Sequence, residues 1–192
     1  IGFSGGALKR GFSFTTEAQL GTRLLSEKVS LTDAPTERQT FPWQRDLMGM
    51  ARKPFPIFEK GVFKAYTWDQ DDADEFGARP TGHTVMHKSL VVSAGEVPVR
   101  SLAELAALPR DKDILYIPYL HYMNFVNPSK GLVTGSSRFG ALLLKKDGTV
   151  ELPYNVRVTQ SLLDLFGDKV AWLSQTQVVN NTSSSYGARN PT

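Results

Sequence analysis

The apolar positions of the chain fall in short runs separated by turn residues, a pattern typical of a β-rich protein. Residues 23–31 alternate in part between apolar and polar, as a half-buried strand does. A tight hairpin is predicted at Lys60-Gly61 and a stronger one at Asp147-Gly148, because each pair lies between β-prone runs. Further strands are expected over 114–117 and 170–179. The three prolines of residues 34–55 predict a long loop.

The predicted helices are few and short. Residues 69–76 begin with acidic side chains and end at Gly77. A capping box at Ser101 opens a second helix that ends before Pro109, and residues 159–166 form a third that stops at Gly167 with a left-handed cap. The expected fold class is therefore α+β and β-rich: a mostly antiparallel sheet, open or closing into a partial barrel, with a few short helices.

Composition and charge narrow the function classes. The 192 residues carry a formal net charge of +3 and no cysteine, which excludes disulfides and a thiolate-bound zinc ion within this segment. The positive excess is spread along the chain without a basic stripe, which argues against direct nucleic-acid binding. No apolar run reaches the roughly 18 residues of a membrane span. No signal-peptide pattern is present, and the polar end at 183–192 suggests a segment of a longer, cytoplasmic protein.

Three motifs suggest catalysis or metal binding, and each lacks its required context. Gly2-Phe3-Ser4-Gly5-Gly6 matches G-x-S-x-G, yet no strand precedes it and no convincing helix follows, so a glycine-rich turn is favoured. His83 and His87 have the i, i+4 spacing of zinc ligands, but their flanks look extended and no Glu lies between them. The acidic run 69–75 fails the calcium-loop pattern at two positions, which favours a solvated helix N-terminus.

A polar, glycine-rich stretch over residues 127–140 is expected to be a loop and stands apart from these motifs. It directly precedes the Asp147-Gly148 hairpin, and its glycines permit close approach of another backbone. Such a segment either connects two strands or approaches an extended peptide, and the sequence leaves both interpretations open.

The order and spacing of several motifs resemble the TldD/PmbA family. The resemblance is collinear from about Leu25 to Asp168, and it rests on several motifs taken together. These motifs are Glu59 to Tyr66, Phe76-Gly77, Pro80 to His83, Asn127-Pro128, Gly131, Thr134-Gly135, Phe139-Gly140, Asp147-Gly148 and Val158 to Phe166. The resemblance implies that residues 1–192 are the carboxy-terminal domain of a modulator-of-gyrase-type protein.

The resemblance also implies an activity. In that family a TldD-like and a PmbA-like subunit form a peptidase, and the TldD-like subunit holds zinc through an H-E-x-x-x-H helix and a Cys loop near the carboxy terminus. The helix would lie before Ile1, and the loop would fall after Val170, where this chain has no Cys. We therefore expect a non-catalytic, PmbA/TldE-like subunit with no cofactor of its own in this segment. Zinc would be held only by a TldD-like partner or through upstream residues.

Three functional hypotheses follow. The first is a metallopeptidase-related subunit that forms a homodimer or a heterodimer with a TldD-like subunit and holds an extended peptide along a sheet edge. The second is part of an active zinc peptidase whose H-E-x-x-x-H lies upstream, and the third is a non-enzymatic β-rich interaction domain. No catalytic residue or metal ligand is expected in this segment. The residues expected to contact a peptide or a partner are Gly82, His83, Asn127, Gly131, Gly135 and Arg138.

Overall fold

Three antiparallel sheets and four short helices make up the described part of the computed structural model, which covers residues 2–40, 43–83, 89–138 and 140–179. The strand orders are β3-β2-β1-β4, β10-β7-β6 and β5-β8-β9. Every pairing between these strands is antiparallel, and none of the three sheets closes into a barrel. The expected β-rich α+β class is confirmed, with open sheets.

The first sheet belongs to the N-terminal half of the chain. Its strands are β1 (Leu31–Asp33), β2 (Phe55–Glu59), β3 (Val62–Phe63) and β4 (Leu90–Val92). The hairpin predicted at Lys60-Gly61 is confirmed, because both residues adopt the positive φ, 46° and 76°, that a type I′ turn requires. Gly61 is also needed for space, since a Cβ there would lie 2.1 Å from the carbonyl oxygen of Leu25.

Two helices flank this sheet, α1 (Gly5–Lys9) and α2 (Gln70–Phe76). Asp69 caps α2 by accepting a 2.8 Å hydrogen bond from the backbone N–H of Asp72, and Gly77 ends it in the left-handed conformation, as predicted. Arg10 of the α1 C-cap reaches across to Asp72 at 2.7 Å and also pairs with Glu75. The acidic run is therefore a helix whose charges are partly neutralised by a neighbouring arginine.

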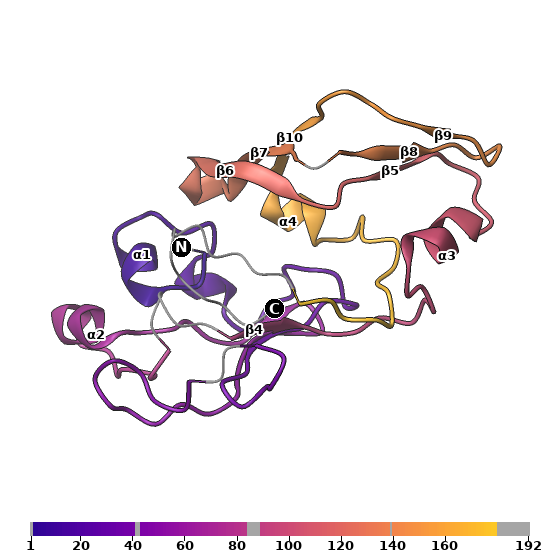
Figure 1. Ribbon diagram of the computed structural model, residues 1–192. Helices are drawn as coiled ribbons and strands as arrows, with labels where there is room; N and C mark the ends of the chain where they lie inside the picture. Colours follow the sequence, from indigo (N-terminus) through magenta and orange to yellow (C-terminus); the bar gives the residue numbers. More distant parts are fainter. Residues whose placement is uncertain (1, 41–42, 84–88, 139, 180–192) are drawn as a thin grey trace.

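The second half of the chain builds the two smaller sheets, which lie along one side of the molecule with α4 beneath them (Figure 1). A three-residue 3₁₀ turn at Pro128–Lys130 connects β6 to β7, and another lies at Glu17–Gln19. The strands are β5 (Ile114–Tyr116), β6 (Leu120–Asn127), β7 (Leu132–Ser137), β8 (Leu142–Leu144), β9 (Val150–Glu151) and β10 (Arg157–Ser161), and the helices are α3 (Leu102–Ala107) and α4 (Leu162–Leu165).

Several sequence-based expectations are wrong. Within residues 23–31 only Leu31 belongs to a strand, because Leu25 and Val29 fill the core from irregular backbone. Residues 170–179 make only an isolated bridge at Ser174. The third helix is confined to α4, since 159–161 pair in β10, and Gly167 does not adopt positive φ. The expected loop over 127–140 contains strand β7 at 132–137.

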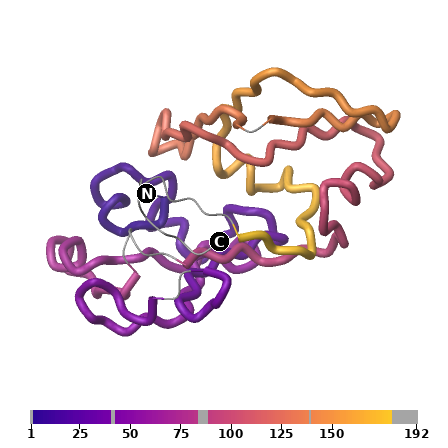
Figure 2. Tube along the Cα trace, in the orientation of Figure 1, coloured from indigo at the N-terminus to yellow at the C-terminus, as the bar shows by residue number. Residues whose placement is uncertain are grey.

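One hydrophobic core joins the two halves. Its buried members are Leu25, Val29, Ile57, Phe58, Phe63 and Tyr66. Leu163 of α4 packs against this core, as do Val170 and Leu173 from the segment that follows. That last described segment, residues 168–179, returns to the N-terminal half, as the tube in Figure 2 shows, and pairs beside Val97. The core thus fixes the position of the second half relative to the first.

Candidate functional site

A buried charged cluster lies where the long loop leaves the first sheet. Asp33, the last residue of β1, is fully buried, and its carboxylate accepts two hydrogen bonds from Nη2 of Arg52, at 2.8 and 2.9 Å. Nδ1 of His83 lies 2.5 Å from the other side of the same carboxylate, and the backbone N–H of Ser89 donates at 2.7 Å. The ring of His83 also packs on Phe55 with centroids 4.7 Å apart.

The electrostatics of this cluster favour a charged Asp33. Burial by itself raises the pKa of Asp33, but the hydrogen bonds from His83, Arg52 and the Ser89 N–H outweigh burial and lower the pKa below its ordinary value. Arg52 is itself 5% exposed, and its Nε has no hydrogen-bond partner. An ion pair that is removed from water is costly unless its geometry is good. The cluster therefore binds the loop firmly to the sheet.

Gly82 and His83 both belong to this interior cluster. His83 is 2% exposed, and Gly82 has φ +74° with its Cα packed toward Ala51 and Arg52. As folded, neither offers a surface to a peptide, so their expected contact role stays a prediction. His87, the partner of His83 in the i, i+4 motif, lies outside the described residues, so the structure does not describe that pair.

Two further predicted contact residues, Asn127 and Gly131, lie at the β6–β7 connection, apart from the Asp33 cluster. The side chain of Asn127 accepts hydrogen bonds from the Lys130 N–H at 3.1 Å and the Ser129 hydroxyl at 2.9 Å, which closes the 3₁₀ turn. Gly131 has φ +60°, and a Cβ there would lie 2.9 Å from the ring of Phe14. The segment therefore has a clear structural role, and its role in binding stays a prediction.

Strand β7 is paired on both sides, which decides which backbone is available to a ligand. Gly135 lies opposite Val158 of β10, and its neighbour Thr134 lies opposite both Thr159 and Asn124 of β6. A peptide strand cannot add to β7 without displacing a neighbour. The two edge strands of this sheet are β6 and β10, and β6 is the longer of the two, with eight residues against five.

Strand β6 presents an unusual edge. It is eight residues long, carries no Asp, Glu, Lys or Arg, and exposes Tyr122, Met123 and Val126 by 76%, 51% and 57%. Its pairing register shifts between His121 and Asn124, and Tyr122 within this bulge has φ +49°. Strain of this kind in a non-glycine residue costs of order 1–3 kcal/mol and is concentrated at functional sites.

Arg138 extends this edge with a cation. Its Nη1 lies 2.8 Å from Nε2 of His121, and the His121 ring meets Tyr122 edge-on with centroids 4.0 Å apart. An exposed arginine beside the exposed Tyr122 ring and the half-buried His121 ring can contact carboxylate and apolar side chains of an extended ligand. Arg138 thus lies beside the exposed edge of β6. Gly131 lies in the turn that connects β6 to β7, and Gly135 lies in β7 itself.

Ser4 of the G-x-S-x-G motif is the N-cap of α1, so the expectation that no helix follows the motif is wrong. Its Oγ accepts a 3.4 Å hydrogen bond from the Ala7 N–H at the start of α1, and the residue is 6% exposed. The adjacent Gly5 permits close packing, because a Cβ there would lie 2.2 Å from the ring of Trp68. Within the described residues the hydroxyl bonds to no histidine, so the motif lacks the arrangement of a nucleophile elbow.

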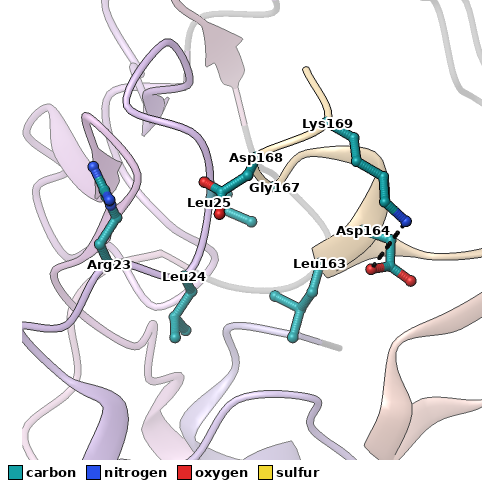
Figure 3. A pocket seen from close by; sticks show the side chains of 8 residues that line it. All are labelled: Arg23, Leu24, Leu25, Leu163, Asp164, Gly167, Asp168 and Lys169. Carbon is teal, nitrogen blue, oxygen red and sulfur yellow. Dashed lines mark ion pairs between the residues drawn. The ribbon is translucent and has the colours of Figure 1, made fainter. Parts of the chain in front are cut away.

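A cleft of about 350 Å³ lies between residues 23–25 and α4, and Figure 3 shows its lining. Arg23 and Lys169 supply two cations, and Asp164 and Asp168 supply two carboxylates, so the lining has no net charge. Lys169 and Asp164 are 4.0 Å apart and largely exposed. The net charge of the lining therefore favours neither an anionic nor a cationic ligand.

The part of the chain that the structure describes does not fit a zinc ion of its own. No three His, Asp or Glu side chains converge there, and the sequence supplies no Cys. In the same described part, no helix is long and apolar enough to cross a membrane.

The model of a single protein family matches residues 1–188, almost the whole chain. That model is described as the PmbA/TldA metallopeptidase C-terminal domain. The chain belongs to the PmbA/TldD family. The resemblance inferred from the motifs between residues 59 and 166 is thereby confirmed, and the chain is a metallopeptidase-related PmbA/TldD domain.

Solved structures agree with this PmbA/TldD assignment. TldE from Thermococcus kodakarensis superposes with a TM-score of 0.69 at 20% identity, over 86% of this chain and 38% of its own. A protein described as a modulator of DNA gyrase from Bacteroides thetaiotaomicron gives 0.68 at 25% identity, over 86% and 36%. One from Thermotoga maritima gives 0.67 at 19% identity, over 86% and 38%. No curated protein matches the chain. The matched region spans less than two-fifths of these solved chains.

The Asp33 cluster is the part of the candidate site that sequence reasoning missed. Arg52 lies 19 residues from Asp33, and His83 lies 50 residues from it, so no spacing rule connects them. The edge of β6 was also not predicted, although an uncharged run follows Tyr119 in a chain that is 21% charged and could have indicated it. Its bulge depends on pairing with β7 and could not be read from the run itself.

Proposed function

We propose that this chain is part of the non-catalytic, PmbA/TldE-like subunit of a TldD/PmbA-type metallopeptidase complex. The observation that carries the proposal is the absence of Cys from a chain whose residues 1–188 match the family domain. A zinc site that loses one of three protein ligands loses much of its affinity and geometry. The cofactor would accordingly be held by a TldD-like partner, in the cytoplasm.

The role of this subunit is pairing and the holding of an extended peptide. Strand addition needs an unpaired edge with backbone N–H and C=O groups and apolar side chains beside it. β6 supports this role with its length, its uncharged sequence and the exposure of Tyr122 and Met123. The edge strand β4 is a poorer candidate, because it has three residues and the carbonyl of Val92 accepts from Gln177.

The test uses the purified full-length protein and the metal-bearing family member of the same organism. We expect the two to associate, with zinc in the partner alone and peptidase activity only in the pair. Stoichiometric zinc in this protein by itself, with peptidase activity that a chelator removes, would overturn the proposal in favour of an active zinc peptidase. Failure to bind either the partner or an unfolded protein such as casein would favour a plain interaction domain.

A further inference from the structure

Methionine thioethers are the oxidisable sulfur groups of this chain, which has four Met and no Cys. Met86 lies outside the described residues. Of the others, Met50 is half-buried, whereas Met48 and Met123 are 70% and 51% exposed. Because oxidation follows exposure, Met48 and Met123 are the sulfurs open to peroxide in the part of the chain that the structure describes. Of the four, only Met123 belongs to β6.

Met123 occupies a bulge in β6, where Tyr122 and Met123 lie opposite a single residue of β7, Gly135. A Cβ at Gly135 would lie 3.0 Å from Cγ of Met123, so the missing side chain leaves space that Met123 uses. The next atoms around that space are Cβ of Leu120 and the carbonyl oxygen of His121, at 3.5 and 3.6 Å. The side chain of Met123 therefore rests beside Gly135 on one face of the sheet, about half exposed.

Oxidation of this thioether is a balanced two-electron step. A lone pair of the sulfur attacks one oxygen of hydrogen peroxide, the O–O bond breaks and an S=O bond forms, and the second oxygen leaves as water after proton transfer. The sulfur is oxidised and the peroxide is reduced. Methionine sulfoxide reductases reverse the change, and they consume a dithiol and release a disulfide and water. The modification is therefore reversible.

A sulfoxide at Met123 would change the β6 edge in two ways. The side chain becomes polar, whereas strand addition gains from apolar side chains beside the paired backbone. None of the three atoms around the space at Gly135 donates a hydrogen bond, so the sulfoxide oxygen has no partner there and turns outward, where an added peptide would lie. Met48 lies instead in the loop between β1 and β2, two strands of a different sheet.

We propose that Met123 is an oxidation-sensitive site of the β6 edge, at which peroxide forms a sulfoxide that weakens peptide holding and a reductase restores it. The inference rests on the proposed function, since it concerns regulation of the strand to which the peptide would add. It also requires that the rest of the full-length chain leave Met123 accessible, because the matched region spans less than two-fifths of the solved relatives.

The test measures casein binding by the full-length protein before and after hydrogen peroxide, which catalase removes before casein is added. Peptide mapping by mass spectrometry locates the sulfoxides. The dissociation constant of the wild type should rise about fivefold or more, the loss typical of an interface side chain that contributes to binding. Methionine sulfoxide reductase should restore it. The melting temperature should stay nearly unchanged, because Met123 is about half exposed.

Two matched variants identify the sulfur responsible. Leucine replaces methionine at nearly the same volume and has no sulfur to oxidise. Met123→Leu should have the same dissociation constant before and after peroxide, whatever its starting value, whereas Met48→Leu should weaken on oxidation as the wild type does. The opposite pattern, or an equal loss in both variants, would overturn the inference.

Three further outcomes separate this inference from the proposed function. Conversion of Met48 while Met123 stays unoxidised would mean that Met123 is covered in the full-length protein, and would overturn the inference while leaving peptide holding in place. Loss of binding that accompanies unfolding of the oxidised protein would overturn the inference in the same way. Untreated protein that binds no casein would overturn both the inference and the peptide-holding role.

Discussion

A single guanidinium nitrogen of Arg52 bonds both carboxylate oxygens of Asp33 in the interior, at 2.8 and 2.9 Å. The two side chains come from opposite ends of a loop, so their pairing fixes where the loop leaves and rejoins the first sheet.

Replacing Arg52 by Met should destabilise the protein strongly. The change leaves a carboxylate buried without its main counter-charge, which costs about 3–5 kcal/mol in unfolding free energy. Urea unfolding followed by circular dichroism measures the loss. Arg23→Met removes the same group from a site where the side chain is 58% exposed, so its effect should stay within about 0.5 kcal/mol. Equal effects of the two variants would mean that the buried pair contributes nothing.

Stability should fall in acid because of Asp33. Its pKa is lower in the folded protein than its unfolded value of about 3.9, so the unfolded state binds more protons as the pH falls. The stabilisation is complete above roughly pH 5 and is lost as the pH falls through the folded pKa. Asp33→Asn should be less stable at neutral pH and should show a flatter profile between pH 3 and 5.

Urea midpoints at several pH values test this dependence. Asp71→Asn, an exposed change on α2, controls for the removal of one negative charge. A profile for Asp33→Asn that runs parallel to the wild type would show that other groups cause the acid sensitivity.

The two hairpin turns should respond differently to alanine. Gly148→Ala introduces a side chain at φ +89° with nothing within 4 Å, and should cost about 1–2 kcal/mol for the left-handed conformation alone. Gly61→Ala adds a collision with the carbonyl of Leu25 and should cost clearly more. Thermal unfolding of the two variants compares them directly. A smaller loss for Gly61→Ala than for Gly148→Ala would contradict the close approach of residues 25 and 61.

These turns also show what the sequence could predict. Lys60-Gly61 and Asp147-Gly148 were identified because the residues that the turn conformation requires are adjacent in the chain. The end of α2 at Gly77 was identified for the same reason. The residues that determine such a turn or helix end are all within a few positions of one another, so the sequence shows them together.

The unpredicted parts depend on distant partners. Leu25 and Val29 alternate like a strand, yet they serve the core from irregular backbone because their partners come from β2 and β3. Gly131 and Gly135 suggested a loop, whereas pairing with β6 and β10 makes residues 132–137 of that segment a central strand. Asp33 gives no local sign that it will be buried, since its partners Arg52 and His83 come from 19 and 50 residues away.

Tyr122 offers a test that separates peptide holding from stability. Tyr122→Asn places a residue that tolerates positive φ in the bulge, and the strain it relieves offsets the loss of the ring contact with His121. Stability should therefore stay within about 1 kcal/mol, while binding of labelled casein weakens several-fold. Tyr154→Asn, at a site 94% exposed outside β6, should change neither. Undiminished casein binding by Tyr122→Asn would remove β6 as the peptide edge.

Segment 168–179 is bound to the N-terminal half largely through its own main-chain groups. Nζ of Lys28 donates to the Ala171 carbonyl, the Gly95 N–H donates to the Ser174 carbonyl, and the Gln175 N–H donates to the Val97 carbonyl. Carbonyl and amide groups are present whatever the side chain, so positions of this segment other than Val170 and Leu173, which pack against the core, can change without releasing it. The chain has room to diverge in sequence while its halves stay together, consistent with relatives at 19–25% identity that superpose over 86% of it.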